Sequence, residues 1–174
     1  MEYQGFQTAD ELARKQTENP NVVRALIFGL VAGAVGAALW FAIVVITQWQ
    51  LGLVAVGIGA LVGTGVMLGA GRKYGRRLQL LSLAITLAAM VVAEYFIVRE
   101  FVVQILTEEH GADYAENVPL FLPLSLAWDF VVEGVQADVT QLFFWALALW
   151  TAFRIPRVPK IKPAVAVAPT TPAA

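Results

Sequence analysis

The sequence contains no cysteine and only one histidine, His110. Without cysteine, the chain can form no disulfide, thiolate metal site, iron–sulfur cluster or thiol nucleophile. A single histidine cannot supply both axial ligands of a buried b-type haem. No nucleophile motif surrounds Ser82 or Ser125, so a serine hydrolase is not indicated either. We therefore expect a non-enzymatic protein with no catalytic residue, no metal site and no cofactor.

Charged residues are also scarce. Only 14% of the 174 residues are charged and 59% are hydrophobic, whereas soluble domains carry about 25% charged residues. The formal net charge of −1 excludes the strongly basic surface of a nucleic-acid-binding protein. The composition predicts an integral membrane protein.

Long apolar runs predict where the chain crosses the membrane. A spanning helix needs about 20 apolar residues to cross a hydrocarbon layer of about 30 Å. The expected helices cover residues 22–47, 51–71, 78–106 and 131–155. The uncharged part of the fourth run is short, so this helix would carry Glu133 and Asp138 into the outer headgroup region. The predicted fold is an all-α polytopic membrane protein with four transmembrane helices.

The distribution of charge predicts the orientation of these helices. With four crossings, every lysine and arginine except Arg99 falls on one side, while carboxylates are concentrated in residues 99–138. The positive-inside rule makes the basic side the cytoplasm. We therefore expect a multi-pass protein of a bacterial cytoplasmic (inner) membrane with both termini cytoplasmic. A three-crossing chain would leave the basic cluster at 154–162 outside.

Three regions are expected along the chain. Residues 1–21 form a cytoplasmic N-terminal segment with a short helix, which begins at a capping box, Thr8 to Glu11. Residues 22–155 form the membrane domain, and residues 156–174 form a disordered Pro/Ala-rich tail. Between the third and fourth helices, the amphipathic segment 118–132 is interrupted by prolines, and we expect it at the outer interface. It would either dock a partner or seal the outer end of the bundle.

Small residues recur at helical spacing in the first two predicted helices. The glycines concerned are Gly29, Gly33, Gly36, Gly59, Gly63, Gly65 and Gly69. In lipid, close association of helices depends on such residues because they allow backbones to approach. Two interpretations stay open: the glycines pack the first helix against the second, or one glycine face docks a partner subunit or a second copy.

Two carboxylates are candidate ion or proton sites. Glu94 lies inside the third apolar run and Asp138 lies at the entrance of the fourth helix. Ionisable residues in spanning segments are costly and indicate a functional role by default. Because Glu94 is expected near the outer interface, it could instead anchor the structure. The acidic segment 108–116 matches neither a calcium loop nor a zinc site in its spacing, so we interpret it as a solvated loop.

The membrane part resembles a family of small, uncharacterised bacterial membrane proteins with four helices. The resemblance is carried in the first hairpin by Gly33, Gly36, Trp40, Thr47, Leu51, Gly52, Gly57, Gly59 and Gly63. In the aromatic closing helix it is carried by Asp138, Leu142, Phe143, Phe144, Ala146, Ala148, Phe153 and Arg154. It covers about residues 22–155 and implies fold and membrane location, but no activity.

Two functions follow as hypotheses. In the first, the protein is a non-enzymatic accessory or scaffold subunit, which packs against a membrane protein partner or itself through glycine faces and the external segment. In the second, it is a small transporter or oligomeric pore that uses Glu94 and Asp138.

Overall fold

Over the residues that the structure describes, four helices form a bundle. The computed structural model describes residues 19–48, 52–111, 113, 118–119 and 139–157. Within this part the helices are α2 (Val22–Thr47), α3 (Gly52–Gly69), α4 (Arg76–His110) and α7 (Val139–Arg154), and the described residues include no strand. The predicted all-α class is therefore confirmed.

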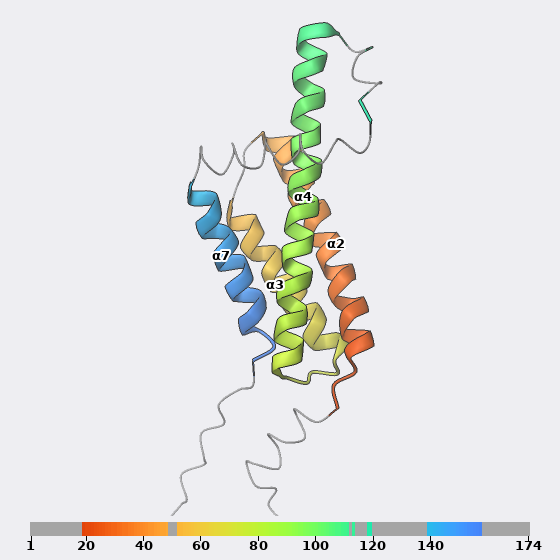
Figure 1. Cartoon of the computed structure of the whole chain (residues 1–174), viewed down its shortest axis with the longest axis vertical. Helices are drawn as coiled ribbons and strands as arrows, with labels where there is room; N and C mark the ends of the chain where they lie inside the picture. The colour runs from red at the N-terminus through yellow and green to blue at the C-terminus, as the bar shows by residue number, and fades with distance from the viewer. Residues whose placement is uncertain (1–18, 49–51, 112, 114–117, 120–138, 158–174) are drawn as a thin grey trace, which may run out of the picture.

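Helices α3 and α4 lie at the centre of the bundle. Each contacts the other three described helices, whereas α2 and α7 do not contact each other over the described residues. Figure 1 shows α4 running the length of the bundle and continuing past the other helices. The core between the helices contains fully buried Trp40, Ile58, Leu78, Met90 and Ile97. These side chains come from α2, α3 and α4, so the three longest helices share one core.

Local sequence signals determine where the helices begin and end. The Asn21 side chain caps α2 because its Oδ1 accepts a hydrogen bond of 3.0 Å from the Arg24 backbone N–H. Helix α4 begins after Gly75 and ends before Gly111, and both glycines have positive φ values. Between them no glycine or proline interrupts the helix. Helix α4 is therefore longer than the expected 78–106.

Three helices, α2, α3 and α4, are long and apolar enough to cross a membrane. Helix α7 has 16 residues, a length of about 24 Å, which is below the thickness of the hydrocarbon layer. Its expected earlier start at residue 131 lies outside the described residues. The same holds for the N-terminal capping box and short helix, for nearly all of the external amphipathic segment, and for the tail after residue 157.

Candidate functional site

The seven glycines predicted to pack helices all face other helices of the same chain. A Cβ atom at Gly69 would lie 2.5 Å from the Arg24 carbonyl oxygen, and one at Gly65 would lie 2.8 Å from the Phe28 carbonyl oxygen. These two glycines therefore bring the backbone of α3 against α2. On α2, Cβ atoms at the other glycines would meet side chains of α3 and α4. They would lie 2.7 Å from Ile85 at Gly29, 3.3 Å from Ile85 at Gly33 and 3.2 Å from Ile58 at Gly36.

The remaining two predicted glycines face α7. A Cβ atom at Gly59 would lie 2.9 Å from the Ala148 carbonyl carbon, and one at Gly63 would lie 3.2 Å from the Ala152 carbonyl oxygen. The closing helix thus packs on α3 with almost no side chain between the two backbones. Gly57 differs, because a Cβ atom there would meet nothing within 4 Å.

Polar side chains of α4 hold the C-terminal end of α7. Ser82 Oγ donates a hydrogen bond of 2.7 Å to the Ala152 carbonyl oxygen, and Gln79 Nε2 donates one of 3.2 Å to the Phe153 carbonyl oxygen. The last carbonyls of a helix have no donor within the helix. Pro156, four residues after Ala152, has no N–H to offer. Gln79 and Ser82 therefore supply donors that the sequence of α7 lacks.

Glu94 continues the contact between α4 and α7 at the N-terminal end of α7. Gln141 Nε2 donates a hydrogen bond of 3.0 Å to Glu94 Oε1. Glu94 is only 6% exposed, and its Oε2 has no hydrogen-bond partner among the described residues. Asp138, the second candidate, lies outside the described residues, so the structure does not bring the two carboxylates together.

Gln79, Ser82 and Gln141 were not among the predicted site residues. A signal for the first two was present in the sequence, because polar residues recur on α4 at Gln79, Ser82 and Thr86, and again at Glu94. These positions follow at offsets of 3, 7 and 15 residues, which places them on one side of a helix. We name these four residues with Gln141 the polar seam.

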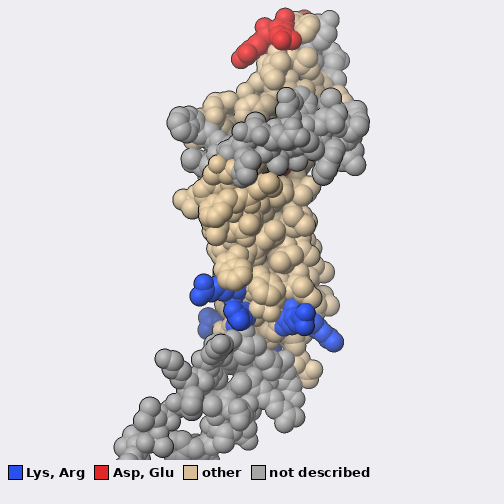
Figure 2. Space-filling model, turned by 60° about the vertical axis from the view of Figure 1, so that its left-hand side comes forward, with Lys and Arg blue, Asp and Glu red and all other residues tan. Residues whose placement is uncertain are grey.

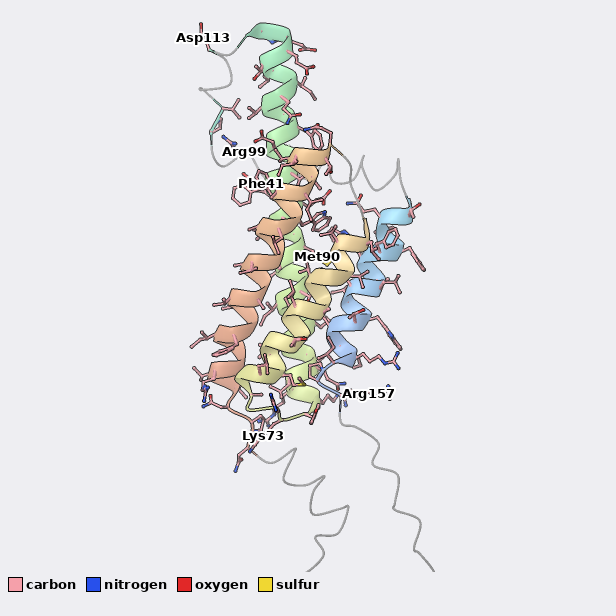
Figure 3. All side chains as sticks on the ribbon, turned by 180° about the vertical axis from the view of Figure 1, so that it is seen from behind. Phe41, Lys73, Met90, Arg99, Asp113 and Arg157 are labelled. Carbon is pink, nitrogen blue, oxygen red and sulfur yellow. The ribbon has the colours of Figure 1, made fainter. Side chains whose placement is uncertain are left out.

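Cations gather at one end of the bundle and described carboxylates lie in the opposite half (Figure 2). The basic ring, as we name it, consists of Arg24, Arg72, Lys73, Arg76, Arg77, Arg154 and Arg157. Figure 3 shows Lys73 and Arg157 at this end and Asp113 at the other. Two hydrogen bonds of 3.2 Å join the helix ends here, from Lys73 Nζ to the Asn19 carbonyl oxygen and from the Gly75 N–H to the Pro156 carbonyl oxygen.

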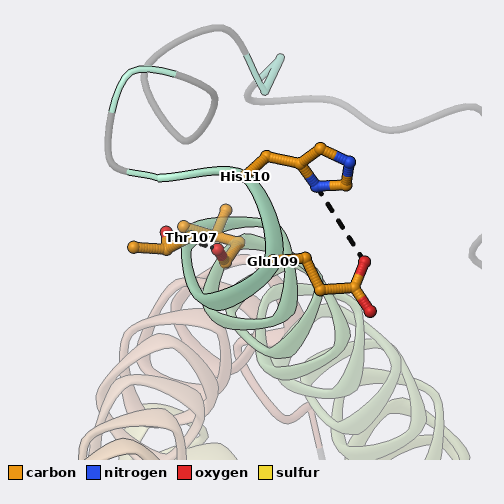
Figure 4. Close-up of polar contacts among 4 residues, drawn as sticks. Thr107, Glu109 and His110 are labelled. Carbon is orange, nitrogen blue, oxygen red and sulfur yellow. Dashed lines mark hydrogen bonds and ion pairs between the residues drawn. The ribbon is translucent and has the colours of Figure 1, made fainter.

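At the opposite end, α4 ends in a polar turn (Figure 4). The Thr107 hydroxyl donates to the Val103 carbonyl oxygen at 2.7 Å, and His110 Nδ1 lies 3.9 Å from Glu109 Oε2. No group of three or more histidine or acidic side chains that could hold a metal ion occurs in the described part of the chain.

An apolar groove runs between α2 and α4 on the surface of the bundle. It consists of two adjoining cavities of about 200 and 370 Å³, which share Ala34, Ala37 and Val92 as lining residues. The smaller cavity extends towards the basic ring as far as Ile85, and the larger extends the other way to Phe96. We name this feature the α2–α4 groove.

Three helices of spanning length and composition define a multi-pass membrane protein. Comparison of the chain with protein-family models, with curated proteins and with solved structures gives no match. Its function is therefore argued from its own residues.

Proposed function

We propose that the protein is a non-enzymatic accessory or scaffold subunit of a membrane complex. In this proposal it crosses a bacterial cytoplasmic membrane four times, with both termini in the cytoplasm. The basic ring supports this orientation, because it joins the start of α2, the turn between α3 and α4, and the end of α7 on one side. Helix α7 would complete its crossing with residues that precede Val139.

The extension of α4 is the observation that carries the accessory role. Gln48, which ends α2, lines the same shallow pocket as Glu100 and Gln104 of α4. Helix α4 from Ile105 to His110 therefore continues about 9 Å further than α2. Ile105 is 49% exposed there, and Glu108 and Glu109 are exposed. An apolar side chain beside acidic ones suits a partner membrane protein with a basic external surface.

The glycine faces are a weaker basis for partner binding. All seven predicted glycines are buried against other helices of the same chain. Gly33 also lines the α2–α4 groove, so the glycines offer a partner little surface while the four helices stay packed. The proposal therefore places the partner on the extension of α4.

Gentle detergent extraction followed by identification of co-purified proteins tests this proposal. A double substitution, Glu108→Lys with Glu109→Lys, should release a partner that the wild-type chain retains. Thr140→Lys is the control, because it adds positive charge at the same end of the bundle on α7, where residue 140 is exposed. A partner that survives the double substitution would show that α4 is not the docking element.

A small transporter or oligomeric pore is the second candidate function. It is favoured by the buried Oε2 of Glu94, which has no partner among the described residues, because a carboxylate oxygen of this kind can accept a proton or contact a cation. Glu94→Gln keeps an acceptor for Gln141 and removes the charge. If the protein is a transporter, this variant should abolish ion flux in reconstituted vesicles. Equal flux with and without the substitution would exclude a role for Glu94 in transport.

A further inference from the structure

We propose that Arg77 and the α2–α4 groove together bind one anionic phospholipid of the leaflet that faces the basic ring. The phosphate would lie at the Arg77 guanidinium, and one acyl chain would lie in the smaller cavity, between Leu30 and Ile85 at one end and Val92 at the other. The proposal concerns a lipid and does not depend on the accessory role.

The dimensions of the groove fit a lipid of that leaflet. Arg77, Ala88 and Val92 share one side of α4, since they are separated by 11 and 15 residues. At 1.5 Å per residue, Ala88 lies about 16 Å and Val92 about 22 Å from Arg77. Half a bilayer, headgroups included, is about 20–22 Å thick. A lipid with its phosphate at Arg77 therefore ends its acyl chain beside Val92, where the smaller cavity also ends.

Arg77 lies about 12 Å along α4 beyond Ile85, where the groove ends, and its positive charge calls for an anion. All described carboxylates lie in the other half of the bundle, and the nearest to Arg77 along α4, Glu94, is about 26 Å away. Residues 1–18 and 158–174 together contain equal numbers of acidic and basic side chains, so they add no net charge to the basic ring. Anionic headgroups of the adjacent leaflet supply the missing charge.

The chemistry of the groove distinguishes a lipid from a partner helix. Its lining is apolar throughout, with alanine, glycine, aliphatic and phenyl groups only. A partner helix would fill the groove and leave Arg77 to the surrounding headgroups, whereas one phospholipid engages both the groove and Arg77. The hydrogen bonds from Lys73 to Asn19 and from Gly75 to Pro156 hold the ring in place, which lowers the ordering cost of binding.

Native mass spectrometry of the full chain in detergent, with added phosphatidylglycerol or phosphatidylcholine, tests the proposal. We expect preferential retention of phosphatidylglycerol and an affinity about fivefold weaker after Arg77→Gln. Arg154→Gln should leave the affinity unchanged, because Arg154 lies on α7, which does not contact α2 in the described structure. Ala34→Phe, which fills the groove, should remove binding of both lipids, while Ala146→Phe on the exposed side of α7 should not.

Other outcomes would overturn the proposal. An equal loss after Arg154→Gln would show diffuse attraction to the basic ring, and displacement by glycerol phosphate would show that the acyl chain contributes nothing. If Ala34→Phe released a protein partner and left phosphatidylglycerol bound, the groove would belong to a partner helix. Because Arg77 is exposed, its substitution tests the headgroup contact even if the groove-filling variant fails to fold.

Discussion

The close approach of α3 and α7 can be tested with two glycines of the same helix. Gly59→Ala adds a methyl group whose carbon would lie against the backbone of Ala148, 2.9 Å from its carbonyl carbon and 3.1 Å from its Cα. Gly57→Ala adds the same group two residues away, where nothing lies within 4 Å. The pair therefore separates the effect of packing from the effect of helix propensity.

The two substitutions are expected to change the free energy of unfolding in opposite directions. Replacement of glycine by alanine within a helix favours folding by about 0.5–1 kcal/mol where there is room, so Gly57→Ala should leave the stability unchanged or raise it slightly. At Gly59 the ordinary contact distance of 3.4–4 Å cannot be reached unless α7 moves. Overpacking of this kind costs about 1–3 kcal/mol. The helix-propensity gain is common to both variants, so the free energy of unfolding of Gly59→Ala should lie about 1–3 kcal/mol below that of Gly57→Ala.

Unfolding of purified protein in mixed detergent micelles, followed by circular dichroism, measures this difference. The two variants carry the same added methyl group in the same helix, so errors in the helix-propensity value cancel. Equal stabilities would refute the close contact between the Gly59 and Ala148 backbones, and with it the position of α7 on α3.

Two further predictions concern α4 and the orientation of the chain. Ser82→Ala removes the hydroxyl that donates to the Ala152 carbonyl and should lower the free energy of unfolding by about 1–3 kcal/mol. Thr86→Val removes a buried hydroxyl that has no partner among the described residues, so it should be neutral or stabilising in the same unfolding assay. A reversed order of the two stabilities would refute the donor role of Ser82. Reporter fusions at Gly111 and at the carboxyl terminus should give signals from opposite sides of the membrane, and signals from one side would refute the four-crossing proposal.

Hydropathy predicts α2, α3 and α4 because an apolar run of spanning length has few ways other than a helix to satisfy its backbone hydrogen bonds in lipid. For α2 the expected and observed bounds both run from residue 22 to residue 47. The end of α4 is harder to predict, because Arg99, Glu100 and the residues near His110 are polar yet compatible with a helix. The helix stops at Gly111, where φ is +92°. The glycine therefore determines where α4 ends, and the earlier change from apolar to polar residues does not.

Which glycines meet which helix could not be read from the sequence. The spacing places Gly59 and Gly63 on one face of the helix and Gly65 and Gly69 on another, because the six residues from Gly59 to Gly65 turn the helix by about 240°. It does not say which neighbour each face meets, and this the structure shows. Gly65 and Gly69 meet α2, whereas Gly59 and Gly63 meet α7. This division depends on the order of the helices around α3, and a residue pattern within a single helix does not contain that order.

The shortness of α7 explains why the polar seam lies where it does. Apolar length alone does not hold this helix in the bundle, since its 16 residues fall short of a full crossing. Pro156 ends it and leaves the Ala152 carbonyl without a backbone donor. In an apolar environment such a carbonyl costs several kcal/mol, so donors from α4 are needed there. Gln79 and Ser82 provide them at one end of α7, and Gln141 binds Glu94 at the other. We therefore expect Glu94 to help fix α7 through its hydrogen bond with Gln141, independent of any role in proton or ion binding.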